Sequence, residues 1–142
     1  MDIVANLIEY LLTVTAITDE TSTRIKPGWI AQGSATPYII IKVVAADHDQ
    51  DLSGKGAFVK KTVSVECVSN SHTEAGTLHK IVRENLDSFQ QQTMGTDNLW
   101  INSTRLTNEF DDIDEPQAAN QKWTFTRTGI YDISYVETEA LP

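Results

Sequence analysis

The stretch "FVKKTVSVECVSNSHTEAGTLHKIVRENLDSF", residues 58–89, predicts a strand followed by a helix, and this unit decides the fold. In its first part apolar and polar residues alternate, which is typical of a strand with one buried face. The apolar face carries Val59, Val63, Val65 and Cys67. In its second part the apolar residues recur at helical spacing instead. They are Ala75, Leu78, Val82, Leu86 and Phe89, with Ile81 widening the stripe.

The start of this helix is marked by Ser71 and Glu74, which have the spacing of a capping box. We therefore expect the helix to begin near His72 and to end near Phe89. His79 borders the apolar stripe, so the pattern predicts a surface or boundary histidine there. The thiol of Cys67 is predicted to be a small buried apolar group rather than a nucleophile.

The flanking sequence adds one helix and several strands. Asp2 can cap a first helix, which the spacing of apolar residues predicts up to residues 13–15. The run "YIIIKVVAA", 38–46, is β-branched and nearly continuous, which favours a strand covered on both faces. Two more strands are expected within 99–110 and 122–136, with Gly129 marking a bend or bulge in the last one.

This order of elements predicts an α+β fold. Consecutive strands with short connections favour an antiparallel sheet, and two amphipathic helices can cover one face of it. The chain of 142 residues has the length of one domain, so residues 1–142 are expected to form a single domain.

The charge of the chain limits its partners. The formal net charge is −9 and the predicted pI is about 4.6. An acidic protein repels phosphate backbones and anionic bilayer surfaces. We therefore expect neither sequence-specific nucleic-acid binding nor membrane binding.

The segment "DHDQDLSGKGAF", 47–58, has three aspartates at the spacing that opens an EF-hand loop: Asp47, Asp49 and Asp51. An EF-hand needs glycine at the sixth position and glutamate at the twelfth. Leu52 and Phe58 occupy these positions, and strands rather than helices are expected on either side. Residues 47–57 are therefore interpreted as a hairpin loop, and no metal or other cofactor is predicted.

The segment "EFDDIDEP", 109–116, holds five acids between Glu109 and Glu115, among them Asp111, Asp112 and Asp114. The pattern predicts a loop that ends at Pro116. Three interpretations remain open: a solvated loop, a surface that faces a basic partner, and the carboxylates of a metal-dependent hydrolase. Metal sites usually take their ligands from several elements, whereas these acids belong to one segment.

Trp29 follows the turn signal Pro27-Gly28 in a segment that looks like a loop. Tryptophans are more often core or interface anchors than parts of ligand sites. Trp29 is the best candidate among the three tryptophans for an exposed anchor.

Nearly the whole chain resembles a family of small bacteriophage tail-completion proteins, also called tail terminators or head–tail joining proteins. The resemblance rests on an ordered series of segments rather than on a catalytic signature. The most specific part is a "PYI" strand, a glycine-containing loop, an alternating strand that ends in "SNS", and the helix "TEAGTLHKIVRENLD". The opening "LIEYLL", the stretch "RLTNEFDDIDEP" and the final "KWTFTRTGIYDISY" complete the series.

The resemblance implies a small α+β domain without enzymatic activity or cofactor. Members of the family form rings, typically hexamers, on the end of the tail tube. The implied partners are copies of the chain itself, the tail tube protein and the head completion or connector protein. The implied location is the tail end or neck of a virion that is assembled in the host cytoplasm. The family offers no site residues to transfer, so the candidate partner or channel surface comes from the residues alone. It comprises Trp29, Asp47, Asp49, Asp51, Asp111, Asp112 and Asp114.

Overall fold

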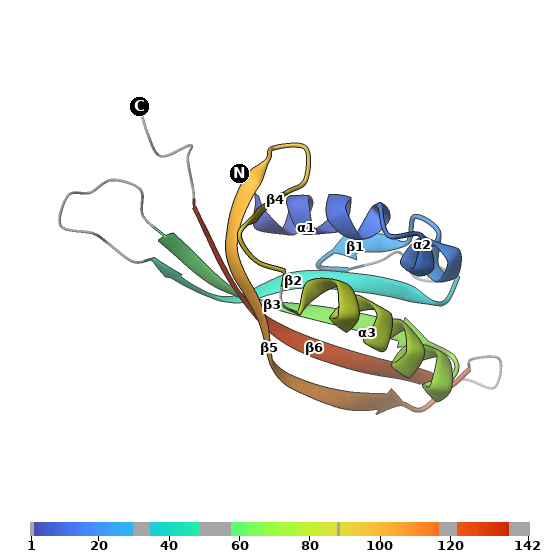
Figure 1. The fold of residues 1–142 in the computed structure, drawn as a ribbon. Coiled ribbons are helices and arrows are strands. Elements are labelled where there is room, and N and C mark those ends of the chain that lie inside the picture. Colours follow the sequence, from blue (N-terminus) through green and yellow to red (C-terminus); the bar gives the residue numbers. More distant parts are fainter. Residues whose placement is uncertain (1, 30–34, 49–57, 88, 117–121, 137–142) are drawn as a thin grey trace.

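A six-stranded sheet with helices packed against it forms the protein in a computed structural model that describes residues 2–29, 35–48, 58–87, 89–116 and 122–136 (Figure 1). The helices are α1 (Ile3–Leu12), α2 (Thr15–Thr21) and α3 (His72–Leu86). The strands are β1 (Ile25–Pro27), β2 (Tyr38–His48), β3 (Phe58–Ser69), β4 (Gln92–Met94), β5 (Leu99–Asp114) and β6 (Thr124–Val136). The predicted α+β fold is confirmed.

The strands lie in the order β1-β2-β3-β6-β5-β4. The four long strands pair antiparallel, as the sequence predicts, and β4 pairs antiparallel with β5. In contrast, β1 pairs parallel with β2, so the prediction of a purely antiparallel sheet is wrong at this edge. Parallel neighbours require the chain to return to the same end of the sheet between the two strands.

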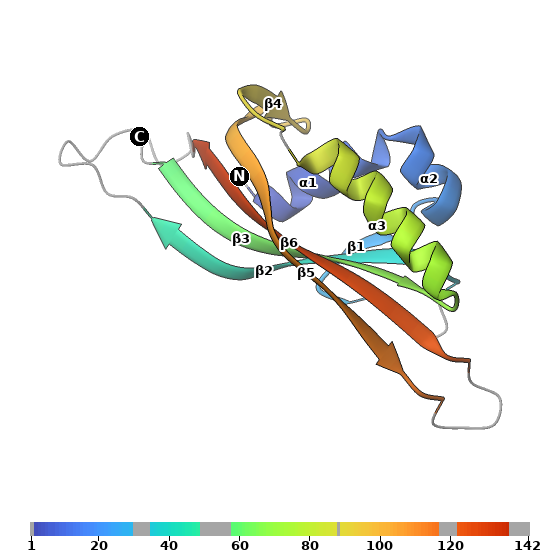
Figure 2. The same cartoon turned by 60° about the horizontal axis from the view of Figure 1, so that its bottom comes forward.

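All three helices lie on the same side of the sheet (Figure 2). The core forms between them and the odd-numbered residues of β3 and β6, where Val63, Val65, Tyr131 and Ile133 are buried. The side of the sheet that faces away from the helices carries no described helix, and we call it the open face. The sequence predicts two helices but not α2, since Thr15–Thr21 is polar and buries only Ile17 and Thr21.

The predicted helix starts are confirmed. Asp2 Oδ1 accepts a hydrogen bond from the Val4 N–H at 3.0 Å. Ser71 Oγ accepts from the Glu74 N–H at 3.4 Å. The Glu74 carboxylate does not close the predicted capping box, because it accepts from Ser69 Oγ instead, at 2.8 Å. This contact joins the start of α3 to the end of β3.

Three strand predictions differ from the structure. β2 is not covered on both faces as predicted: Ile39 and Ile41 are buried, but the successive residues Val43 and Val44 are both exposed. A short strand, β4, forms between the helix and the strand that begins at Leu99, where the sequence predicts no strand. Gly129 lies in a continuous ladder with Val65, and the register shifts occur in β5 rather than in β6.

Two further properties bear on function. Cys67 is fully buried, as predicted, and burial raises the pKa of its thiol. Among the helices of the described residues, none is both long and apolar enough to cross a membrane.

Gly95 and Gly28 provide a matched test of how α1 is held against β4. Both have positive φ, +75° and +74°, which disfavours alanine by roughly 1 kcal/mol. A Cβ at Gly95 would lie 2.2 Å from Asn6 Oδ1, whereas a Cβ at Gly28 would meet no atom within 4 Å. We expect Gly28→Ala to cost about 1 kcal/mol of unfolding free energy and Gly95→Ala at least about 2 kcal/mol. Urea denaturation measures the unfolding free energy of both variants. Equal losses would contradict the close approach of Asn6 to Gly95.

Candidate functional site

The acidic segment belongs to strand β5, so its prediction as a loop is wrong. Residues 109–114 pair one by one with residues 124–129 of β6. Because successive side chains of a strand point to opposite faces, pairing divides the acids between two surfaces. Glu109 and Asp111 lie on the helix side, opposite Gly129 and Arg127. Asp112 and Asp114 therefore lie on the open face.

On the helix side, the acids contact basic side chains of α3 and β6. His79 Nε2 donates to Glu109 Oε2 at 2.5 Å, and Arg83 Nη1 lies 3.7 Å from Glu109 Oε1. Arg127 Nε lies 2.7 Å from Asp111 Oδ1. These contacts bind the far half of β5 to the helix layer.

A third contact of Asp111 extends this network to the first residue of α3. His72 Nε2 lies 3.7 Å from Asp111 Oδ2. The His72 ring also packs edge-on against Phe125 of β6, with ring centroids 5.8 Å apart. The start of α3 is therefore joined to both strands of the hairpin.

His79 is the residue that sequence reasoning misplaced. It is 3% exposed rather than at the surface, and its Cε1 would lie 2.9 Å from a Cβ at Gly129. Glycine at position 129 therefore makes room for the imidazole, which is a different role from the predicted bend. The signal was present, since Ala75, His79, Val82 and Leu86 follow helical spacing along one stripe.

The network changes the acidity of Glu109. Its pKa is lowered from the ordinary value of 4.5, chiefly because the His79 side chain donates a hydrogen bond to it. Partial burial opposes this effect, while the nearby charges of His79, Arg83 and Arg127 add to it. The carboxylate is thus held in its ionised form.

The arrangement does not favour the hydrolase interpretation. Asp111 is engaged by Arg127, and Asp112 and Asp114 lie on the other side of the strand. Asp112 accepts a hydrogen bond from the Ile113 N–H at 2.9 Å. Within the described ranges, no group of three His, Cys, Asp or Glu side chains is placed to hold a metal ion.

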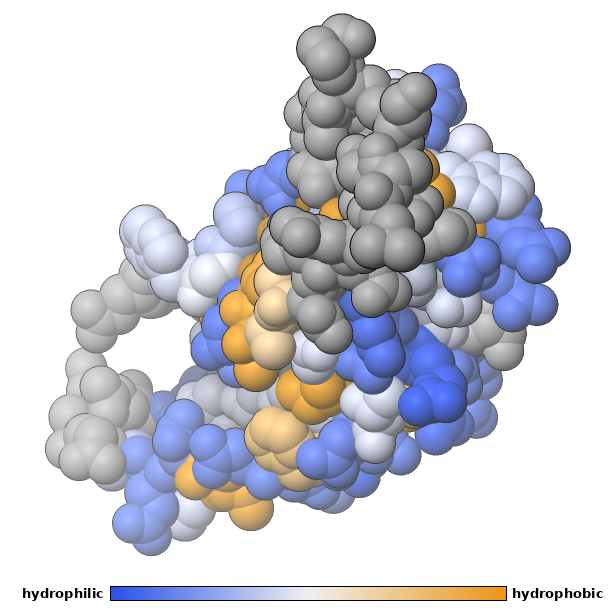
Figure 3. Space-filling view, turned by 90° about the vertical axis from the view of Figure 1, so that its left-hand side faces the viewer, coloured by the Kyte–Doolittle hydropathy of each residue, from blue (hydrophilic) through white to orange (hydrophobic). Residues whose placement is uncertain are grey.

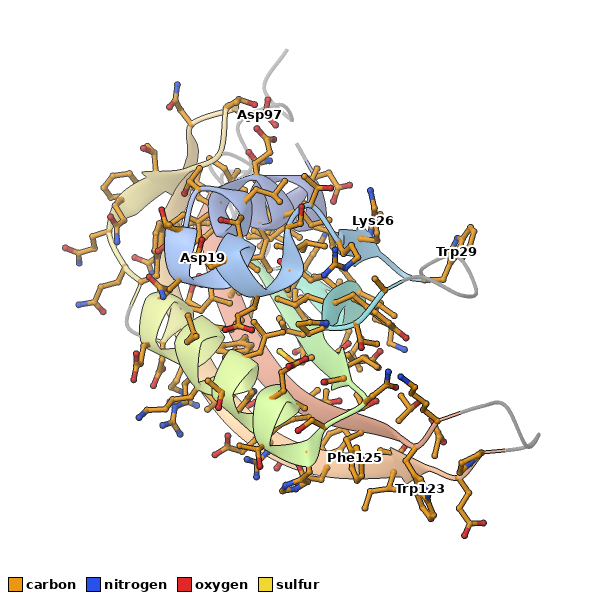
Figure 4. The ribbon with its side chains drawn as sticks, turned by 90° about the vertical axis from the view of Figure 1, so that its right-hand side faces the viewer. Asp19, Lys26, Trp29, Asp97, Trp123 and Phe125 are labelled. Atoms are coloured by element: carbon orange, nitrogen blue, oxygen red, sulfur yellow. The ribbon has the colours of Figure 1, made fainter. Side chains whose placement is uncertain are left out.

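Exposed apolar side chains accompany the acids on the same hairpin. Phe110 and Ile113 of β5 are about half exposed, as is Trp123 just before β6. Figure 4 shows Trp123 and Phe125 together at the far end of this hairpin. Because Ile113 pairs with Phe125, the helix side of the hairpin tip is apolar as well as acidic. Such a surface is typical of a contact with another protein.

The other predicted surface residues lie elsewhere. Trp29 projects from the segment after β1 and is 71% exposed, so its predicted exposure is confirmed (Figure 4). Asp47 lies in β2 near its end rather than in a loop. Asp49 and Asp51 lie outside the described residues. The sheet register sets Asp47 opposite Lys60 of β3, toward the other end of the sheet from Asp112 and Asp114, so the two acidic groups do not form one site.

A polar hollow of about 460 Å³ lies near the β5 register shift. Lys60, Arg105 and Asp132 contribute to its lining. Asp132 already accepts from Thr62 Oγ1 at 2.8 Å and lies 4.0 Å from Lys60 Nζ. The hollow therefore differs from an apolar ligand pocket, and its charges are largely balanced.

No known protein family and no curated protein matches the chain by sequence. Its fold occurs in a virion. The chain is similar to one in the solved structure described as "Virion of native gene transfer agent (GTA) particle", with a TM-score of 0.68. The similarity covers 95% of each chain at 9% identity, so it establishes a common fold over the full length.

The lowered pKa of Glu109 predicts how stability depends on pH. A group whose pKa is lower in the folded state stabilises the fold above its unfolded pKa, and this contribution is lost as pH falls through the folded value. Glu109→Gln removes it. We expect the variant to be less stable than the native protein at pH 6, and the difference to shrink as pH falls below about 4.5. Urea denaturation across this range measures the difference.

Asp112→Asn is the matched control, because this acid lies on the same strand but on the open face. This variant should not reproduce the pH-dependent loss of stability expected for Glu109→Gln, because Glu109 rather than Asp112 contacts His79 and Arg83. If the difference in unfolding free energy between Glu109→Gln and the native protein is the same at all pH values, the contacts assigned to Glu109 are wrong.

Proposed function

We propose that the protein is a non-enzymatic structural subunit of a phage-like virion, which assembles as a ring on the end of the tail tube. The observation that carries the proposal is the full-length fold similarity to a chain of a virion particle. The resemblance of the ordered segments to tail-completion proteins suggests the finer role: to end tube growth and to offer a surface for head joining. The proposed location is the tail end or neck of the virion, after assembly in the host cytoplasm.

The exposed surfaces suit an assembly subunit. A cyclic ring requires two different contact surfaces on each copy, since each subunit meets its two neighbours through unlike faces. The hairpin of β5 and β6 and the projecting Trp29 are candidate contact surfaces, because both expose large apolar side chains. The proposed partners are other copies of the chain, in a hexamer, together with the tail tube protein and the head completion or connector protein.

The acids of the open face have a use in this setting. Asp112 and Asp114 have no described helix above them and are exposed. A ring that passes viral DNA needs a channel that does not retain a polyanion, and acidic side chains repel phosphates. The same acids would also attract a basic partner. The proposal therefore assigns the open face of β5 to the channel or to a docking surface.

Electron microscopy and mass measurement of the purified chain, alone and with tail tubes, test the proposed function. The expected result is rings of uniform size and caps on tube ends. A protein that stays monomeric at high concentration and never binds tube ends would rule the proposal out.

Neutralising the open-face acids tests their role. The double variant Asp112→Asn with Asp114→Asn should keep its fold, since neither acid joins the network around His79. We expect it to lower the yield of joined heads and tails, or of infectious particles, by at least about tenfold if each lost charge matters at the level of 1 kcal/mol. A complementation assay in the phage measures the yield.

The control is Asp19→Asn with Glu20→Gln, which makes the same change in net charge on the exposed surface of α2 (Figure 4). It should leave the yield unchanged. Equal losses from both double variants would mean that total charge matters rather than the open face of β5.

A further inference from the structure

Two long stretches of edge strand have no partner strand within the described residues. β1 pairs with only 39–41 of β2, which leaves 42–48 open. β4 pairs with only 99–101 of β5. The Leu106 N–H donates a hydrogen bond to Asp87 Oδ1 at 3.2 Å, so the stretch of β5 without a described partner is 107–114. Along 107–114 the Glu109 N–H donates to Asn108 Oδ1 at 3.0 Å. The Ile113 N–H donates to Asp112 Oδ1 at 2.9 Å, so another strand would have to replace these two local hydrogen bonds. The other outward-facing N–H and C=O groups of such edges are templates for another strand.

These open edges carry exposed apolar side chains. Of the eight large apolar residues exposed in the described part of the chain, four lie on the two open stretches. They are Val43, Val44, Phe110 and Ile113. Apolar residues are also visible between hydrophilic ones when the molecule is seen from the end that carries the tips of β2 and β3 (Figure 3). Proteins protect solitary edges with charges and short strands. The acids of 107–114 protect this edge against a like edge, but both stretches are long and expose apolar side chains, which favours pairing with an edge of different charge.

We propose that the open stretch 107–114 of β5 pairs antiparallel with the open stretch 42–48 of β2 from the next copy, so that one sheet continues from subunit to subunit. This inference rests on the proposed ring and names the contact that builds it. Within the sheet, β5 and β2 both run antiparallel to a strand of the β3–β6 pair and are antiparallel to each other. A neighbour whose sheet extends this one therefore presents β2 to β5 in the antiparallel sense.

The register of the sheet makes this pairing sterically possible. Across the sheet, Asp111 of β5 pairs with Arg127 of β6, which pairs with Cys67 of β3. Cys67 in turn pairs with Ile39 of β2, so Asp111 and Ile39 lie at the same position along the strand direction. To set Val44 of the next copy beside Asp111, that copy must shift by 44 − 39 = 5 residues along the strands, roughly 17 Å. After this shift, β1 of the next copy lies at the end of β5 of the first copy, at Asp114. β2 of the next copy then does not overlap with β4 of the first copy. A staggered register is also what closing a sheet into a ring requires.

Charge favours this contact over pairing of like edges. The stretch 107–114 contains four acids and no cation, so two copies of β5 would set carboxylates opposite carboxylates. The stretch 42–48 contains one acid, Asp47, and Lys42, which lies 3.2 Å from Glu66 of β3. The adjacent strand β3 adds Lys61 and Lys60, the latter 4.0 Å from Asp132, so this edge is much less acidic than the β5 edge. The β2 edge is therefore the better partner for the acidic β5 edge, and the resulting contact is head-to-tail, as a ring needs.

Crosslinking tests the contact directly. The native cysteine, Cys67, is buried, so added thiols at exposed positions react selectively. In this register Phe110 lies opposite Ala45 of the next copy, and both are exposed. The double variant Ala45→Cys with Phe110→Cys, treated with a short bismaleimide, should give a ladder of covalent oligomers beyond the dimer. Each single variant should give almost no product. Dimers from either single variant at the same yield would show pairing of like edges and would overturn the proposal.

A charge pair at one position supplies the second test. Val44→Glu sets an acid against the acidic edge of the neighbour, whereas Val44→Lys sets a cation there. Val44 is 58% exposed, so both variants should fold, which circular dichroism checks. We expect Val44→Glu to raise the concentration needed for ring assembly by roughly fivefold or more, and Val44→Lys to leave it near the native value. High salt should weaken the defect.

The outcomes separate this contact from the proposed function. If the native chain forms rings but the double variant gives no ladder, or if both Val44 variants assemble alike, the edge contact is wrong and the ring stands. If the native chain forms no rings while the double variant still gives a ladder, the edge contact stands and the ring function is wrong. Absence of both rings and ladder overturns both.

Discussion

The difference in rise between helices and strands shapes this protein. A helix advances about 1.5 Å per residue and a strand about 3.3 Å. The 15 residues of α3 therefore span about 22 Å, whereas the 16 residues of β5 span about 53 Å. A helix with nearly the same number of residues therefore cannot cover such a strand, and the sheet extends past its helix layer. The uncovered parts of β2 and β5 carry the exposed apolar and acidic side chains on which the proposed assembly depends.

The far half of β5 is nevertheless held in place by a local network. His79 lies over Gly129 and donates to Glu109, and Arg127 pairs with Asp111. A hairpin whose strands extend beyond the core would otherwise depend on its backbone ladder alone. The ion pairs orient one set of acids toward the helices, and the pleat of the strand turns the other set toward the open face. One acidic segment thus serves both the stability of the subunit and its outer surface.

The sequence predicted the elements with strong periodicity. The alternation of Val63 and Val65 and the spacing of Leu78 and Val82 indicated β3 and α3, because a buried face leaves its period in the sequence. The start signals at Asp2 and Ser71 were also confirmed. The misses have a common cause. These elements depend on tertiary contacts rather than on local sequence preference. α2 and β4 are short and polar, and the acidic part of β5 is a strand because it pairs with β6.

The candidate site was harder to predict than the fold. The density of acids singled out 109–115, and the turn signal Pro27-Gly28 predicted that Trp29 is exposed. The partners of the acids could not be read in the same way, since His79 and Arg83 lie on α3 and Arg127 on β6, far from β5 along the chain. The chain by itself determined an acidic α+β subunit with amphipathic helices, because those properties depend on composition and local periodicity. Only the tertiary structure decided which acids are paired, which face the solvent and which edges stay open, because strand register brings distant residues together.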